Sequence, residues 1–270
     1  MRSSNPVLNS LSGAKAAANY YGGYNNAQDP YGAYTAPVQS ERPMTVDDVV
    51  TSTGITLGVI IVGALVNFGI AAFFNPQLAL ILTAVGAIGG LIMVLVSTFG
   101  KKYGSKAVTL AYAAFEGLFV GGISLILSGF LVGNQNAGNL IGQAILGTIG
   151  VFIGMLFVYK SGAIRVTPRF TRILTGAIIG VLVLALGNML MYFLGFGAPL
   201  RDGGPIAIIF SLVCIVLAAL SFLQDFDIAD RLIREGAPAK YSWGVALGLA
   251  VTLVWLYTEI LRLLSYFQQR

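Results

Sequence analysis

Residues 205–224 read PIAIIFSLVCIVLAALSFLQ, a stretch of 20 positions without a charged side chain. The hydrocarbon core of a bilayer is about 30 Å thick, and about 20 helical residues cross it. Six further apolar runs of similar length lie at residues 53–74, 78–99, 107–132, 139–159, 173–196 and 241–264. The sequence therefore predicts an all-α integral membrane protein, a bundle of seven transmembrane helices over residues 45–266.

The composition agrees with a membrane protein and argues against an enzyme. Hydrophobic residues make up 56% of the chain and charged residues only 10%. The absence of histidine excludes histidine-based general bases, catalytic triads and the commonest zinc sites. The sequence also contains no phosphate-binding loop, dinucleotide fingerprint or nucleophile elbow. We expect neither an enzyme nor a bound cofactor.

The basic residues predict how the helices are oriented. Most of the sixteen Lys and Arg residues lie before the first span or in alternate connections on the same side of the membrane. The opposite side has Arg201, Arg262 and Arg270. Short basic loops stay cytoplasmic, so we expect a multi-pass protein of the plasma membrane with a cytoplasmic N-terminus and an external C-terminus. Because the cations flank apolar spans, we expect contact with the lipid bilayer and none with nucleic acid.

Residues 1–44 differ in composition from the rest. Tyrosines are scattered there among Gly, Asn, Ala and Pro without a helical or strand period. We expect a disordered cytoplasmic tail, which could dock a membrane-protein partner or lipid headgroups. Thr45, followed by Asp47 and Asp48, predicts a helix cap with the helix starting near Val46. Residues 267–270 form the C-terminal end.

Glycine and proline indicate how the spans pack. Glycine pairs at a spacing of four occur at Gly54/Gly58, Gly117/Gly121, Gly150/Gly154, Gly176/Gly180 and Gly244/Gly248. Such pairs let helix backbones approach closely, either within one bundle, the favoured interpretation, or between two copies of the chain. No proline lies at the centre of a span, which predicts continuous helices and argues against a carrier built on broken helices.

A few acidic residues fall inside or beside the apolar runs and are the candidates for function. Glu116 lies about ten residues into the third span, about 15 Å deep, where an unpaired charge is costly. Glu259 lies nearer the outer end of the last span and could pair locally with Arg262. Asp225 and Asp227 lie where the sixth span meets the cytosol. Two neighbouring carboxylates suit a hard cation such as Ca²⁺, or a proton-sensitive latch.

At these residues the chain resembles a known family. Residues 111–124, AYAAFEGLFVGGIS, resemble the third helix of bacterial Bax inhibitor-1-like proteins. The closing segment resembles that of the same family at residues 225–227, 236–238 and 253–264. The resemblance covers residues 45–266 and leaves out the tail. It implies a seven-helix bundle whose last helix is central, surrounded by the other six.

The resemblance also implies an activity, a pH-sensitive leak of Ca²⁺ down its gradient. In the family, aspartates on helices six and seven gate the leak from the cytosolic side, helped by an arginine on helix two. Asp225 or Asp227 matches the helix-six acid, whereas the helix-seven position falls near Thr252. Span two has no arginine, and its nearest cations are Lys101 and Lys102.

The missing partner leaves two forms of the gate open. Asp225 and Asp227 could act together, or Glu116 could replace the missing aspartate. Without histidine, a response between about pH 5 and pH 8 must come from carboxylates that titrate above their usual range, which lies near about pH 4. Because Asp225 and Asp227 are two residues apart, one should point into the bundle and the other toward the headgroups or Arg231.

The leading hypothesis is therefore a cation leak channel gated by carboxylate protonation, with Ca²⁺ as the ion that the resemblance implies. The alternative is a non-conducting membrane regulator that binds other membrane proteins.

Overall fold

The computed structural model describes residues 42–100, 102–130 and 136–268, and its elements are helical. They are α2 (Val46–Phe73), α3 (Pro76–Phe99), α4 (Lys106–Leu127), α5 (Ala137–Ser161), α6 (Pro168–Phe193), α7 (Pro205–Arg234), the short 3₁₀ helix η2 (Ala239–Tyr241) and α8 (Ser242–Gln268). Seven of them are long and apolar enough to cross a membrane. The predicted all-helical membrane fold is confirmed, and each span is one uninterrupted helix.

The helices begin where local chemistry favours a start. The hydroxyl of Thr45 accepts a hydrogen bond from the backbone N–H of Asp48, whose carboxylate accepts one from the N–H of Thr45 in return. This reciprocal cap confirms the predicted start of the first helix at Val46. Prolines occupy the first turn of α3, α6 and α7, where the absent N–H has no helical partner to lose.

Helix α7 extends beyond the predicted membrane span. The apolar run ends at residue 224, and the helix continues to Arg234. Asp225 and Asp227 therefore both lie on α7, about two turns before its end. The extension is stabilised by ion pairs across one turn, Asp227 with Arg231 and Asp230 with Arg234.

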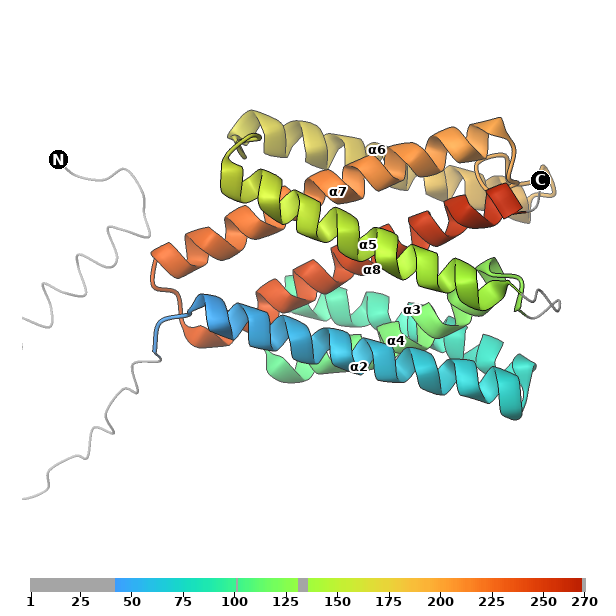
Figure 1. Ribbon diagram of the computed structural model, residues 1–270, viewed down its shortest axis with the longest axis horizontal. Coiled ribbons are helices and arrows are strands. Elements are labelled where there is room, and N and C mark those ends of the chain that lie inside the picture. The colour runs from blue at the N-terminus through green and yellow to red at the C-terminus, as the bar shows by residue number, and fades with distance from the viewer. Residues whose placement is uncertain (1–41, 101, 131–135, 269–270) are drawn as a thin grey trace, which may run out of the picture. The chain divides into compact units, whose positions relative to one another are not determined.

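The last helix is central, as predicted. Figure 1 shows α8 running between α2, α3 and α4 on one side and α5, α6 and α7 on the other. It packs directly on α2, α4, α5 and α7, while α3 packs mainly on α4 and α6 mainly on α7. Accordingly α8 is the most buried span, and α5 and α6 are the least buried. The outward faces of α5 and α6 carry exposed Leu, Ile and Phe side chains that suit contact with lipid.

The close helix contacts are made at a subset of the glycines. A Cβ atom on Gly117 would lie 2.6 Å from the carbonyl oxygen of Ile60, and one on Gly121 would lie 2.5 Å from that of Ala64. The backbones of α4 and α2 thus touch, as expected for packing within one bundle. Packing within one bundle is the wrong interpretation for three other pairs, where an added Cβ would meet no atom within 4 Å: Gly54/Gly58, Gly150/Gly154 and Gly176/Gly180. In the fifth pair, Gly244 lies against the side chain of Tyr103, and a Cβ on Gly248 would again meet no atom within 4 Å.

The two ends of the bundle differ in charge. The end where α2 and α8 begin, here called the basic end, carries ten of the described Lys and Arg residues. They are Arg42, Lys102, Lys106, Lys160, Arg165, Arg169, Arg172, Arg231, Arg234 and Lys240. The end where α8 finishes, here called the opposite end, has Arg201 and Arg262 among the described residues. Lys and Arg concentrate in the cytoplasmic loops of membrane proteins, and the predicted orientation rests on this difference between the two ends.

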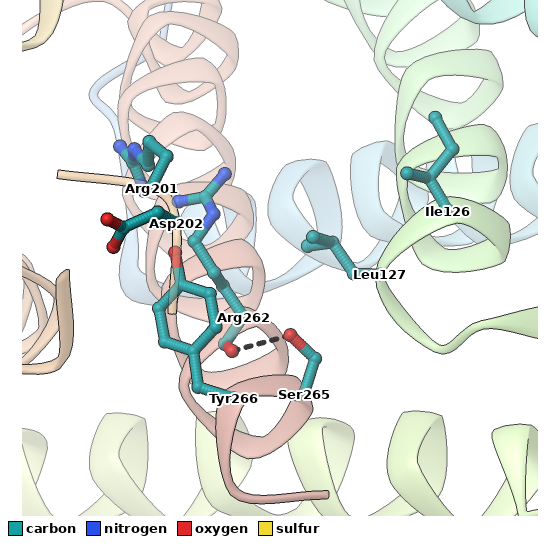
Figure 2. Close-up of a pocket in the computed structure, with 7 residues that line it drawn as sticks. All are labelled: Ile126, Leu127, Arg201, Asp202, Arg262, Ser265 and Tyr266. Atoms are coloured by element: carbon teal, nitrogen blue, oxygen red, sulfur yellow. Dashed lines mark hydrogen bonds between the residues drawn. The ribbon is translucent and has the colours of Figure 1, made fainter. Parts of the chain in front are cut away.

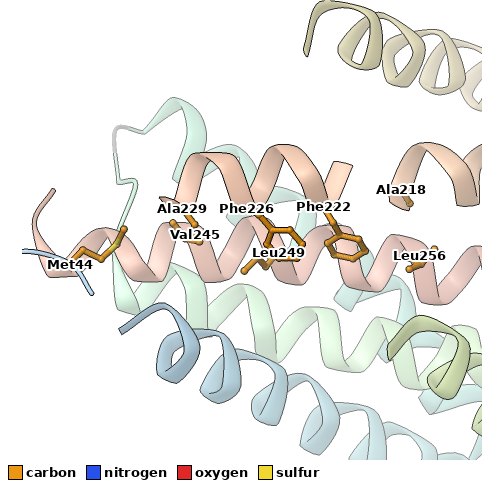
Figure 3. Close-up of a cluster of buried hydrophobic side chains, with 8 residues drawn as sticks. All are labelled: Met44, Ala218, Phe222, Phe226, Ala229, Val245, Leu249 and Leu256. Carbon is orange, nitrogen blue, oxygen red and sulfur yellow. The ribbon is translucent and has the colours of Figure 1, made fainter. Parts of the chain in front are cut away.

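A hydrophobic cluster fixes α7 against α8 near the basic end. Figure 3 shows Met44, Phe226, Ala229 and Val245 near the basic end, with Phe222 one turn of α7 farther from that end. Met44 is only 2% exposed, and its N–H donates to the carbonyl of Ala237 at 2.7 Å. The segment before α2 is thereby attached to the turn between α7 and α8, and the cluster holds the part of α7 that carries Asp225.

Candidate functional site

Asp225 lies at the contact between α7 and the central helix. Its carboxylate accepts a hydrogen bond of 2.7 Å from the hydroxyl of Thr252 on α8. Phe222 and Phe226, one on each side of Asp225 along the chain, are buried in the α7–α8 cluster. Within the described residues the structure gives Asp225 no ion pair, so its partner is a neutral hydroxyl. Thr252 lies near the position that the family resemblance gives to the second aspartate.

Asp227 points elsewhere. Its carboxylate pairs with Arg231 one turn later on α7, at the surface of the basic end. The expected division is thus observed: one aspartate of the pair faces the bundle and the other faces a surface arginine. The two carboxylates do not converge on a common point, and the described residues contain no group of three or more Asp, Glu or Cys that could hold a metal ion.

An aromatic pair lies beside this site at the basic end. The ring of Tyr103, from the connection between α3 and α4, packs over Gly244 of α8, where a Cβ would lie 2.6 Å from the ring. Tyr241 lies next to it, with ring centroids 5.7 Å apart. Partial desolvation of the phenol, together with the negative charge of Asp225, raises the pKa of Tyr103, although the residue is still 42% exposed. Tyr103 is therefore a protonated neighbour of the carboxylate, and sequence reasoning missed it.

Glu116 occupies a different interface. A Cβ on Gly90 of α3 would lie 2.7 Å from its Oε2 atom and 3.9 Å from the ring of Tyr112. The carboxylate is thus held between α4 and α3, in the space that Gly90 leaves. Glu116 faces a neighbouring helix, but the structure does not bring it to Asp225.

Glu259 lies in an ion cluster toward the opposite end of α8. Its side chain is 3% exposed and accepts hydrogen bonds from Arg262 at 2.7 Å and from Arg201 at 3.1 and 3.2 Å. The expected local pair with Arg262 is confirmed. Arg201, from the connection between α6 and α7, was missed because it lies far away in the sequence. The guanidinium of Arg201 also lies 5.2 Å from the centre of the Phe210 ring.

Polar contacts recur along the whole of α8. From the basic end onward they join α8 to α2 (Ser242 with Ser52), to α7 (Thr252 with Asp225), to α4 (Tyr257 with Ser124) and to the α6–α7 connection (Glu259 with Arg201). Hydroxyl contacts of this kind join membrane helices to one another, whereas ionisable groups at membrane depth are rare. The central helix is therefore joined to its neighbours by polar contacts at several levels.

The comparison with protein families agrees with these observations. The model of the family described as Bax inhibitor 1 like matches residues 5–269. The chain belongs to this family. The match begins at residue 5, so the prediction that the resemblance leaves out the tail is wrong. Comparison with curated proteins found no match. This Bax inhibitor 1-like protein is thus a multi-pass membrane protein.

Proposed function

We propose that this Bax inhibitor 1-like protein is a pH-sensitive cation leak channel of the plasma membrane, with Ca²⁺ as its ion. The observation that carries the proposal is the contact between Asp225 and Thr252. At this contact a carboxylate lies between α7 and the central helix, and none of the described residues gives it a counter-charge. A carboxylate in that position is tolerated in a membrane protein chiefly where it serves ions or protons.

Protonation offers a simple switch for this contact. The ionised carboxylate only accepts hydrogen bonds, and the Thr252 hydroxyl donates to it. A protonated carboxyl group can itself donate, and the hydroxyl can turn toward the carbonyl of Gly248, which it already approaches at 3.3 Å. Adding a proton therefore removes the charge that fixes the contact and lets α7 and α8 separate at the basic end.

The same atoms suit a passing Ca²⁺ ion. Calcium prefers carboxylate, hydroxyl, carbonyl and water oxygens in flexible arrangements. Asp225 and Thr252 supply such oxygens, and water would complete the shell. Asp227, held by Arg231, takes a secondary role at the mouth of the basic end. Glu259 and Arg262 form a charged cluster farther along α8. Glu116 is the alternative proton sensor if Asp225 does not have that role.

The proposal includes an orientation with the basic end in the cytosol. Reporter fusions at residues 104 and 165 should then report a cytosolic position, and a fusion at residue 270 an external one. An external reporter at 104 would reverse the orientation. A cytosolic reporter at 270 would contradict the odd number of crossings.

The test of the channel is flux through the purified protein in liposomes, with Ca²⁺, K⁺ and H⁺ compared from about pH 5 to about pH 8. We expect Ca²⁺ flux that depends on pH in the wild type and in Asp227→Asn, and loss of the pH dependence in Asp225→Asn. The matched asparagine pair separates the inward carboxylate from its surface neighbour. An unchanged pH response in Asp225→Asn would place the sensor elsewhere, with Glu116→Gln as the next variant.

The second candidate is a non-conducting regulator that binds other membrane proteins. The exposed glycine pairs on α5 and α6 favour it, because such faces accept neighbouring helices closely and nothing in the described chain covers them. Wild-type protein that conducts none of the three ions in liposomes would favour this function over the channel.

A further inference from the structure

A cavity of about 370 Å³ opens at the opposite end of the bundle. Figure 2 shows its lining: Ile126, Leu127, Arg201, Asp202, Arg262, Ser265 and Tyr266. It lies between the end of α4, the α6–α7 connection and the last turns of α8. Its volume is at the lower end of the range for small-molecule sites. Its lining combines both signs of charge with an apolar wall, which restricts the kind of ligand that fits.

The cavity presents hydrogen-bond donors that the protein does not use up. In the part of the chain that the structure describes, the side chains of Arg201 and Arg262 donate hydrogen bonds only to Glu259, each through Nη1, so their other N–H groups are open to a ligand. The Tyr266 side chain is also buried, with the residue 6% exposed. Its hydroxyl points toward Arg201 and Asp202 in Figure 2 and lies beside the hydroxyl of Ser211, and neither of these two buried hydroxyls completes a hydrogen bond of ordinary geometry within the described residues. Ser211 is the partner that the protein offers to Tyr266, and a ligand oxygen would compete for the same donor.

An acidic group is present in the same lining. Asp202 is exposed, and its Oδ1 atom accepts a hydrogen bond from the N–H of Gly204 at 2.8 Å, while Oδ2 has no hydrogen-bond partner among the described residues and can face a ligand. A simple anion would be repelled by Asp202, and a simple cation by the two arginines. The charges are best satisfied by a ligand that carries a negative and a positive group a few bonds apart.

We propose that this cavity binds a phosphoethanolamine group, either as the headgroup of a zwitterionic phospholipid or as the free phosphomonoester. Guanidinium groups are the preferred partners of phosphate oxygens, so Arg201 and Arg262 hold the phosphate. The Tyr266 hydroxyl adds a donor to it. Asp202 pairs with the primary ammonium, and Ile126 and Leu127 face the glycerol of a lipid. Binding at this cavity does not depend on ion conduction by the protein, so the two proposals can be tested separately.

The test measures ligand binding to the full chain in detergent by native mass spectrometry, with short-chain phosphatidylethanolamine and phosphatidylglycerol. Free phosphoethanolamine and inorganic phosphate serve as soluble competitors. We expect saturable binding of phosphatidylethanolamine, tighter than that of phosphatidylglycerol. Displacement by free phosphoethanolamine would indicate a site open to the soluble compound as well. If free phosphoethanolamine does not displace bound phosphatidylethanolamine, the natural ligand is the headgroup of the phospholipid.

Two variants probe the two halves of the site. Tyr266→Phe removes only a hydroxyl that completes no hydrogen bond of ordinary geometry within the described residues, so it should change thermal stability little while weakening phosphatidylethanolamine binding about tenfold. Tyr192→Phe, an exposed tyrosine at the same end, should bind as the wild type does. Asp202→Asn should abolish the preference for phosphatidylethanolamine over phosphatidylglycerol. Absence of saturable binding, or equal affinities in the wild type, Tyr266→Phe and Asp202→Asn, would overturn the proposal.

Discussion

Replacing Glu259 with glutamine should be among the most damaging conservative changes in this protein. Its carboxylate balances Arg201 and Arg262 at the same time, and its side chain is 3% exposed. Removing one member of a buried ion pair costs about 3–5 kcal/mol, because the remaining charge loses its compensation. The two guanidinium groups keep 29% and 17% exposure, so water offsets part of that loss. We expect a decrease of about 3 kcal/mol in the free energy of unfolding.

The assay is reversible unfolding of the purified protein in mixed micelles, followed by circular dichroism. Asp227→Asn is the matched control, because it removes a half-buried carboxylate whose partner, Arg231, lies one helical turn away and is exposed. Such a pair contributes about 0.2–0.5 kcal/mol. If Glu259→Gln lost no more stability than Asp227→Asn, the cluster would have to be hydrated and energetically minor, and the reasoning from burial would be refuted.

Three further variants test packing and the gate. Gly86→Ala should lower the free energy of unfolding by about 1–3 kcal/mol, because its Cβ would lie 2.5 Å from a backbone oxygen of α4. Gly180→Ala, which has open space around the added Cβ, should change that free energy by less than about 1 kcal/mol in the same assay. Met44→Ala should cost about 2–5 kcal/mol there, since this buried side chain fills the α7–α8 cluster. Thr252→Val should move the midpoint of pH-dependent flux in liposomes upward, because the ionised Asp225 loses its hydrogen-bond donor; an unmoved midpoint would remove Thr252 from the gate.

The sequence predicts the spans well because one physical cause dominates them. Apolar runs of bilayer length identify the seven helices, and local chemistry identifies the start of the first one at Thr45. The helical period also predicts that Asp225 and Asp227 point in different directions. It does not predict which one faces α8, because that depends on how α7 is rotated within the bundle.

The remaining features depend on neighbours that no local pattern specifies. Arg201 meets Glu259 only because the start of α7 and the end of α8 lie side by side. The glycine pairs Gly117/Gly121 and Gly176/Gly180 look alike in sequence, yet only the first pair lies against another helix. Spacing reveals which faces permit a close approach, whereas the tertiary fold decides which of them are used.

The two carboxylate contacts of α8 together determine how α7 can move. Arg201 attaches the segment before α7 to Glu259, and Thr252 attaches α8 to Asp225 near the other end of α7. The carboxylate of Glu259 is paired with two cations, whereas that of Asp225 has only a neutral hydroxyl as its partner. As the pH falls, we therefore expect Asp225 to be protonated before Glu259. Losing only the Asp225 contact lets α7 tilt away from α8 at the basic end while the opposite end stays held. We therefore expect Asp225→Asn to change how flux depends on pH, and Glu259→Gln to raise flux at every pH, because it releases the fixed end of the same helix.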